Sequence, residues 1–241
     1  MKTEAEIRID LAVALRLVAK LGLHEAVANH FSAAISEDGQ KFLLNPKWKH
    51  FSKVKASDLI LLDANDPNSF DPAKIDNTAW AIHGQIHQLR PDIKVVMHLH
   101  PIYATTLSCL KSPVLIPIEQ NSARYFNRVA YDLHYGGMAD HLAEGQRLCY
   151  CLGKHKRLMM GNHGILIASH DIGVAFDDMY TFERASQIVV NAYATGQALN
   201  VLSDEVAEKT AQDWEGIEDF SIAHFNEMKA LLIAEDPSVL D

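Results

Sequence analysis

Hydrophobic residues recur at helical spacing near the beginning of the chain and again in its second half. From residue 4 to residue 21 they fall at intervals of three and four, which predicts an amphipathic helix, and Gly22 follows where a C-terminal cap is expected. The same periodicity over residues 172–199 predicts a long helix. Further helices are predicted over residues 76–90, 101–110, 140–152 and 217–234.

Short apolar runs between the helices predict β-strands. Residues 31–35 and 41–44 flank the dipeptide Asp38-Gly39, which is typical of a hairpin turn. A third buried strand is predicted at residues 59–62, and others at 93–100, 114–118, 129–131 and 157–168. Because helices and strands are mixed and the first pairing is antiparallel, the pattern predicts a layered α/β or α+β domain.

Composition narrows the class of protein. The chain has 241 residues, of which 48% are hydrophobic and 22% are charged, so a single domain spanning residues 1–241 with a full hydrophobic core is expected. The formal net charge of −9 argues against nucleic acid as a partner. No apolar run is long enough to span a membrane, and the charged N-terminal residues are unlike a signal peptide.

The cysteines indicate a reducing compartment. Cys109, Cys149 and Cys151 are an odd number of thiols, and their spacing fits neither a zinc motif nor a redox motif. We expect them to be small buried side chains. The sequence therefore predicts a cytoplasmic protein that has no membrane partner.

Two histidines stand at the predicted end of one strand. His98 and His100 project to the same face of an extended strand, because successive side chains alternate, and Pro101 ends the strand directly after them. This spacing suits two nitrogens that converge on a divalent cation. It also suits a hydrogen-bonded polar strand end, so the pair alone leaves both interpretations open.

A third histidine interrupts the apolar run at residues 157–168. His163 lies between Asn162 and Gly164, and a buried polar group without a partner there would cost about 1–3 kcal/mol. His163 therefore needs a partner, and a metal ion is one candidate. Gly164 would let the backbone turn closely beside it.

Together these motifs resemble the class II aldolase/adducin domain. The resemblance rests on His98-Leu-His100-Pro, on Asn162-His-Gly164 and on the segment 180–185, with similar motifs at 22–32, 44–46 and 56–59. It covers about residues 5–200 and leaves a helical tail at 203–241. It implies a three-layer α/β/α fold with a mostly antiparallel central sheet. It also implies a homotetramer with active sites at the subunit interfaces.

The same resemblance implies a divalent metal held by three histidines, which are His98, His100 and His163 in this chain. Zinc is the common metal of the family, and manganese, cobalt and magnesium are alternatives. Three neutral imidazoles leave an open coordination position, as in catalytic zinc sites. The family's aldolases use this position to bind the two oxygens of a hydroxy-carbonyl substrate and to stabilise an enediolate.

The chain departs from the family's aldolases at residues around the metal. Their acid/base glutamate corresponds to Ala79, so ordinary aldolase chemistry is not expected. Their first phosphate-binding loop corresponds to residues 28–32, where alanine replaces the glycine that such a loop needs. We expect a polar group, not a phosphorylated sugar, to be bound by Asn29, Ser32, Asn77 and Thr78.

Two residues that follow the first metal ligands are further candidates. Glu119 comes after an apolar run, so it is either an acid/base catalyst near the metal or part of a surface or interface ion pair. The fork of Arg124 suits a substrate carboxylate, although a subunit salt bridge is the alternative. A hydroxy or keto acid substrate would make retro-aldol cleavage or decarboxylation the adjacent chemistry.

His83 and His87 lie four positions apart, on one face of the predicted helix at 76–90. Gly84 stands where the protease motif His-Glu-x-x-His needs glutamate, so that motif is excluded. His83 therefore either packs near the metal or lies with His87 on the helix surface.

The leading hypothesis is a metal-dependent, aldolase-like lyase that acts on a small hydroxy-carbonyl or carboxylate compound. The alternative is a non-catalytic, oligomeric adducin-like interaction protein that retains the metal site. The main support for the alternative is Ala79, since it removes the family's acid/base group.

Overall fold

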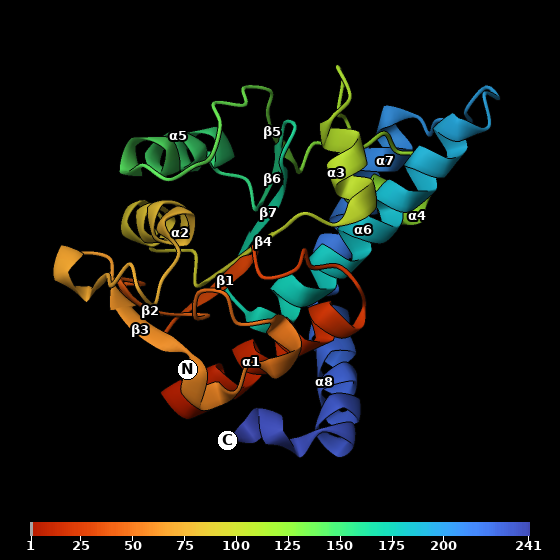
Figure 1. Ribbon diagram of the computed structural model, residues 1–241. Helices are drawn as coiled ribbons and strands as arrows, with labels where there is room; N and C mark the ends of the chain where they lie inside the picture. Colours follow the sequence, from red (N-terminus) through yellow and green to blue (C-terminus); the bar gives the residue numbers. More distant parts are fainter. Residues whose placement is uncertain (1) are drawn as a thin grey trace.

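A seven-stranded sheet with helices on both of its faces forms the centre of the molecule (Figure 1). The computed structural model describes residues 2–241. The strands are β1 (His30–Ala34), β2 (Lys41–Leu44), β3 (Ile60–Asp63), β4 (Val95–Leu99), β5 (Ala130–Asp132), β6 (Arg157–Met160) and β7 (Gly164–Ser169). The α-helices are α1 (Glu4–Lys20), α2 (Asn77–Leu89), α3 (Ile102–Ser108), α4 (Gln120–Ala123), α5 (Leu142–Leu152), α6 (Ile172–Ala194), α7 (Asp204–Glu215) and α8 (Glu218–Glu235). Short 3-10 helices are η1 (Phe51–Lys53), η2 (Ala56–Asp58), η3 (Pro67–Ser69) and η4 (Pro237–Leu240).

Strand β4 lies in the middle of the sheet. The order is β3-β2-β1-β4-β7-β6-β5, and every neighbouring pair is antiparallel except β5 and β6. His98 of β4 lies opposite His30 of β1 on one side and opposite Leu166 of β7 on the other. All residues of β4 are buried. The expected mostly antiparallel sheet between helical layers is therefore confirmed.

The two faces of the sheet carry separate helical layers. Helices α2 and α5 cover one face, and α1, α3, α6 and α8 cover the other (Figure 1). Val95, Met97 and Leu99 of β4 belong to the core beneath the second layer, whereas Val96 belongs to the core beneath α2 and α5. Because strand side chains alternate, His98 lies on the α2 and α5 face.

The predicted signals for the first helix and the first hairpin are confirmed. Thr3 caps α1, since its hydroxyl accepts a hydrogen bond from the Glu6 amide and the Glu6 carboxylate accepts one from the Thr3 amide. Gly22 follows the helix with a φ of 68°, and Gly39 turns the chain between β1 and β2 with a φ of 80°. Both values lie in the left-handed region that favours glycine.

Two predicted strands were wrong in extent. The run at residues 157–168 forms two strands, because Asn162 adopts a left-handed φ of 56° and turns the chain between β6 and β7. Residues 114–118 form no strand. Pro113 precedes this segment and Pro117 lies within it, and neither has an amide hydrogen. The Leu115 amide donates to the Tyr131 hydroxyl instead of to a strand.

Three other expectations need correction. The predicted third buried strand is the edge strand β3, whose Leu61 is 43% exposed. The segment after residue 203 contains two helices, α7 and α8, where one was predicted. Cys149 is buried as expected, but Cys109 and Cys151 are exposed, and all three thiols are free.

Within residues 2–241, none of the helices combines the length and the apolar character that crossing a bilayer requires.

Helices α2 and α5 pack closely because Gly145 has no side chain. A Cβ added to Gly145 would lie 1.9 Å from the Ala81 carbonyl oxygen. Gly145→Ala should therefore force the helices apart and lower the free energy of unfolding by at least about 2 kcal/mol in urea titrations. Gly84→Ala on α2 is the matched control, since its Cβ would make an ordinary 3.6 Å contact with the Trp80 ring. Equal stability of the two variants would contradict this packing.

Candidate metal centre

Three histidine side chains converge at one end of β4. His98 lies within β4, His100 follows its last residue, and His163 lies in the turn between β6 and β7. One ligand nitrogen of each histidine lies within 4.8 Å of the other two. The ring centroids of each pair are 4.8 Å apart, and the Nε2 atoms of His98 and His100 are 3.0 Å apart. The three predicted metal ligands therefore share one location.

The close approach of β7 to the end of β4 brings His163 to the other two ligands. A Cβ on Gly164 would lie 2.5 Å from the Leu99 carbonyl oxygen and 2.8 Å from Cδ2 of His100. Only glycine fits this position without displacing the strand end. The turn itself is held by the Asn162 amide, which donates to the Ser108 carbonyl over 3.0 Å. Glycine and the left-handed asparagine are therefore both needed to place His163.

Hydrogen bonds orient two of the ligands. Nδ1 of His98 lies 3.1 Å from the carbonyl oxygen of Ile165, and Nδ1 of His100 contacts the Glu25 carboxylate. Both partners can only accept, so each Nδ1 carries a hydrogen and the lone pair of a neutral ring is on Nε2. Burial, followed by the neighbouring His163 and His100, holds the pKa of His98 well below its usual range.

These orientations test whether the residues fit a metal. Two Nε2 lone pairs 3.0 Å apart repel each other unless a proton or a cation lies between them. A third imidazole nitrogen nearby favours a cation that all three share, since three neutral imidazoles are a known ligand set for catalytic zinc. Burial also lowers the pKa of His163 to about 4, so its ring is neutral and able to coordinate at neutral pH.

A buried chain of hydrogen bonds runs from this site into the space between β1 and α2. Nδ1 of His30 lies 2.7 Å from Nε2 of His83, and Nδ1 of His83 lies 2.6 Å from the Ser32 hydroxyl. The same hydroxyl lies 2.8 Å from Nε2 of His87. Burial lowers the pKa of His30 and of His87 to about 3, and it holds the pKa of His83 well below its usual range. All three rings are therefore neutral at neutral pH.

One contact fixes the direction of this chain. The Thr78 hydroxyl donates its only hydrogen to the Asp76 carboxylate over 2.5 Å, so it can only accept from Nε2 of His30, 3.3 Å away. Nε2 of His30 then carries the hydrogen and Nδ1 accepts from His83. It follows that His83 accepts from Ser32, which accepts from His87. His30 thus presents an N–H group at the wall of the metal site.

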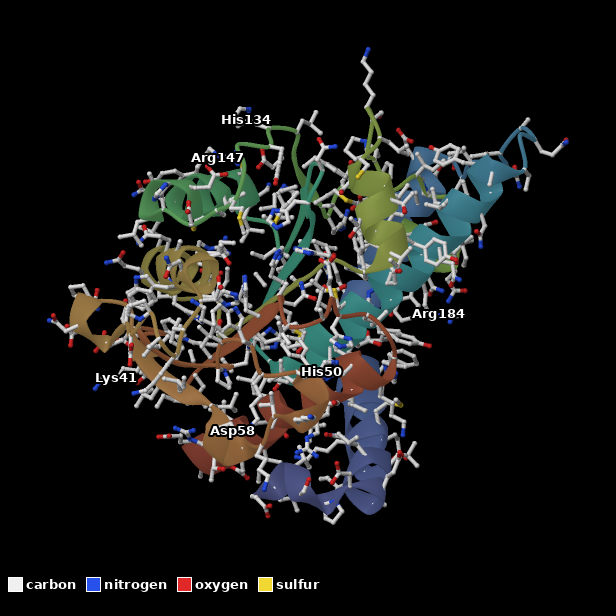
Figure 2. The ribbon with its side chains drawn as sticks, viewed as in Figure 1. Lys41, His50, Asp58, His134, Arg147 and Arg184 are labelled. Atoms are coloured by element: carbon white, nitrogen blue, oxygen red, sulfur yellow. The ribbon has the colours of Figure 1, made fainter. Side chains whose placement is uncertain are left out.

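The three ligands and His30 line one cavity of about 280 Å³. The loop between β5 and α5 forms part of its wall through Tyr135 and Met138. Arg147 of α5 anchors this loop, because its guanidinium donates to the Asp132 carboxylate over 2.6 Å and to the His134 carbonyl over 3.3 Å (Figure 2). The ring centroids of Tyr135 and His163 lie 6.2 Å apart, so the tyrosine is close to the metal ligands.

The four candidate substrate-binding residues near β1 and α2 have different locations. Thr78 lines the cavity. Ser32 is fully buried in the histidine chain, and Asn77 lies exposed at the start of α2. Asn29 is buried, its Oδ1 accepts from the Glu25 amide, and its Nδ2 has no partner among residues 2–241. A role for these residues in substrate binding remains a prediction.

Glu119 and Arg124 lie outside the residues that line this cavity. The Glu119 carboxylate caps α4 by accepting hydrogen bonds from the amides of Asn121 and Ser122. Arg124 is buried, donates to Asp177 over 2.8 Å and lines a separate cavity. Ala79 is buried within α2, where it packs against a small apolar cluster. The catalytic and carboxylate-binding roles of Glu119 and Arg124 also remain predictions.

The sequence analysis did not predict the hydrogen-bond acceptors of His98 and His100, nor the chain of buried histidines beside the metal ligands. His30 and Ser32 share a strand face, and His83 and His87 share a helix face, so the two patterns together were a signal for a polar contact between β1 and α2. Of the two alternatives for the helix histidines, a place on the helix surface was wrong, since His83 and His87 are both fully buried. Glu25 gave no such signal, because it lies in an irregular loop far from His100 in sequence.

The buried histidines predict a loss of stability in acid. The pKa of His87 is about 3 in the folded chain and near 6.5 in the unfolded chain, so only the unfolded chain takes up the proton between these values. Stability should be full above about pH 6.5 and fall by up to about 1.4 kcal/mol per pH unit per such group as the pH decreases towards 3. Urea titrations of His87→Gln between pH 8 and 4.5 should show a shallower decline than the unchanged protein. An identical decline would contradict the neutral, buried state of His87.

Comparisons with known proteins give the wider context of this arrangement. A "putative aldolase class 2 protein" of Pseudomonas aeruginosa is 33% identical over 199 residues, which are 81% of this chain and 75% of the relative. The decarboxylase NovR of Streptomyces niveus is 28% identical over 86% of this chain and 77% of its own length.

A solved structure and a family match complete the comparison. This chain is similar to the crystal structure of an aldolase II superfamily protein from Pseudomonas syringae. The superposition covers 100% of this chain and 97% of the other, with 29% sequence identity and a TM-score of 0.89. The family described as the class II aldolase and adducin N-terminal domain matches residues 9–190. The chain therefore belongs to the class II aldolase and adducin family.

Proposed function

We propose that this chain is a metal-dependent carbon–carbon lyase that acts on a small hydroxy-carbonyl or carboxylate compound by retro-aldol cleavage or decarboxylation. The observation that carries the proposal is the convergence of three imidazole nitrogens at the wall of a cavity of about 280 Å³. A cavity of this size suits a small metabolite. The decarboxylase name of the NovR relative supports the carboxylate branch of the proposal.

His98, His100 and His163 are the residues that would hold the metal. Imidazole ligands suit zinc best, and manganese, cobalt and magnesium are the alternatives. A bound divalent metal would polarise the substrate's oxygen atoms as a Lewis acid. The contact between Glu25 and His100 orients that ring, which is the usual role of a carboxylate behind a ligating histidine.

The side chain of His30 can donate a hydrogen bond to a bound substrate. Its Nε2–H faces Thr78 at the cavity wall, and its ring centroid lies 4.9 Å from that of His98. A substrate oxygen beside His98 can replace Thr78 as the acceptor of this hydrogen bond. Because the Thr78–Asp76 contact fixes the tautomer of His30, and its Nδ1 is held by His83, the donor is already aligned when the substrate binds.

Tyr135 and water are the remaining groups of the cavity that could exchange protons with the substrate. Tyr135 is half exposed on the loop between β5 and α5, next to His163. The acid/base glutamate of the aldolases corresponds to Ala79, whose methyl group cannot donate or accept a proton. A small-molecule substrate, a homotetrameric assembly and a cytoplasmic location belong to the same proposal.

A non-catalytic, adducin-like interaction protein is the second candidate function. The observation in its favour is the loss of the acid/base group at Ala79, together with the use of the Glu119 carboxylate as a helix cap. The family itself combines aldolases with adducin domains. This candidate would retain the histidine cluster without turnover.

Turnover measurements distinguish the two candidates. Metal-loaded protein should cleave or decarboxylate members of a panel of hydroxy-aldehydes, hydroxy acids and β-keto acids, and a chelator should abolish this activity reversibly. His163→Ala should have no measurable activity, whereas His170→Ala, which changes an exposed histidine outside the cavity, should retain it. Metal-bound protein that turns over no member of the panel would favour the interaction protein.

The proposed donor gives a separate kinetic prediction. Removal of one aligned donor usually costs about a hundredfold in kcat, so His30→Ala should lower kcat by about that factor. His30→Gln keeps an N–H donor on a side chain of similar length and should recover part of the loss. Metal content should be the same in both variants and in the unchanged protein. An unchanged kcat in His30→Ala would show that His30 does not serve the reaction.

A further inference from the structure

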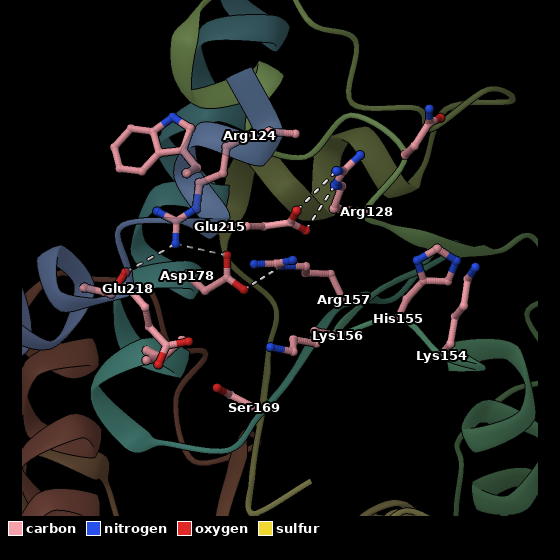
Figure 3. Close-up of a pocket in the computed structure, with 15 residues that line it drawn as sticks. Arg124, Arg128, Lys154, His155, Lys156, Arg157, Ser169, Asp178, Glu215 and Glu218 are labelled. Carbon is pink, nitrogen blue, oxygen red and sulfur yellow. Dashed lines mark hydrogen bonds and ion pairs between the residues drawn. The ribbon is translucent and has the colours of Figure 1, made fainter. Parts of the chain in front are cut away.

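Figure 3 shows a second cavity, of about 560 Å³, whose wall includes none of the three metal ligands. Its wall contains residues 154–157 at the beginning of β6, whereas His163 follows the other end of that strand. The opposite wall comes from α6, α7 and the first turn of α8, through Asp178, Trp214 and Ser221. No residue is shared between the walls of the two cavities. The second cavity is therefore separate from the proposed active site.

The wall of this cavity is cationic in an otherwise acidic chain. Five lysine and arginine side chains line it against three carboxylates, although the whole chain has a net charge of −9. The cationic residues are Arg124, Arg128, Lys154, Lys156 and Arg157. A local patch of positive charge on a negatively charged protein attracts anions to the cavity. The cavity walls strengthen this attraction because they limit screening by solvent.

Each carboxylate in the wall already has a partner. Asp178 accepts from Arg157 over 2.6 Å, Glu215 accepts from Arg128 over 3.2 Å, and Glu218 contacts His170 over 2.9 Å. Arg124 and Arg128 are also paired, with Asp177 and Glu208, so the lysines of the wall are the cations that have no carboxylate partner.

Lys154 and Lys156 are the uncompensated cations. Both side chains are exposed, and neither amine has a carboxylate within 4.0 Å among residues 2–241. Arg157 adds to them, because its Nε binds Asp178 while its two terminal nitrogens make no hydrogen bond in the described chain. Figure 3 shows the cationic groups of Arg157 and Lys156 facing the same space. Their free donors are available to a ligand.

The buried arginine behind them makes the wall rigid. Arg124 is 7% exposed, donates to Asp177 over 2.8 Å and stacks on the Trp214 ring with its guanidinium carbon 5.0 Å from the ring centroid. Asp178 is also buried: its Oδ2 accepts from Arg157, and its Oδ1 lies 3.8 Å from a terminal nitrogen of Arg124.

We propose that this cavity is a second binding site for a small phosphorylated molecule with at least two negative charges. Lys156 and the free terminal nitrogens of Arg157 bind the phosphate oxygens, and Lys154 adds positive charge to the same wall. Charge-assisted hydrogen bonds of this kind are the strong ones in protein recognition. The site is independent of the proposed lyase function.

Isothermal titration calorimetry with inorganic pyrophosphate and with ADP tests this site. The double variant Lys154→Gln/Lys156→Gln should bind both probes at least about tenfold more weakly than the unchanged protein at low ionic strength. Lys41→Gln/Lys53→Gln is the matched control, because it removes the same charge from two exposed lysines outside the cavity.

A third variant separates this site from the metal centre, which could also attract pyrophosphate. Binding to the second cavity should persist in His98→Ala, which removes a metal ligand. Binding that is lost in His98→Ala and kept in Lys154→Gln/Lys156→Gln would place the anion at the metal and overturn the proposal. Equal weakening in the two lysine double variants would show a general charge effect, and no binding to the unchanged protein would also overturn it.

Discussion

The hydrogen bonding of β4 between β1 and β7 is the constraint on which the rest of the site depends. This strand has no solvent-facing edge, and its side chains alternate between the two cores, so His98 must point into the layer beneath α2 and α5. The β1 register places His30 beside it, and the β7 register brings the turn with His163 to the strand end. A slip of one residue in either pairing would turn these imidazoles to the opposite face.

The layer between β1 and α2 is stabilised by polar contacts where an apolar core would be ordinary. His30, His83, Ser32 and His87 are fully or almost fully buried, and each unpaired polar group there would cost about 1–3 kcal/mol. A single direction of donation satisfies their contacts with one another, leaves Nδ1 of His87 without a partner among residues 2–241, and ends at the Nε2–H of His30 in the metal cavity. Thr78 and Asp76 set the tautomer of His30 at that end, so the buried network and a group of the proposed active site share one direction of donation. A metal at the neighbouring ligands would face a ring that is already aligned.

Much of this arrangement could be predicted from the sequence, because it follows from local rules. Alternation along β4 predicted that His98 and His100 share a face, and a polar break in an apolar run marked His163. The first helix and the hairpin at Gly39 followed from capping and turn residues. Tertiary contacts decided the rest. The contact of Glu25 with His100 joins segments far apart in sequence. Pro113 and Pro117 lack the amide hydrogens that a strand at residues 114–118 would need.

We propose that three histidines from two separate segments form one metal site. Elemental mass spectrometry on untagged protein after reconstitution tests this site directly, with His98→Ala and His163→Ala as variants and His170→Ala as the control. We expect about one divalent ion per chain in the unchanged protein and the control, and loss of that ion in both variants. An unchanged protein without metal, or a variant that keeps its full metal content, would show that these histidines do not form a metal site.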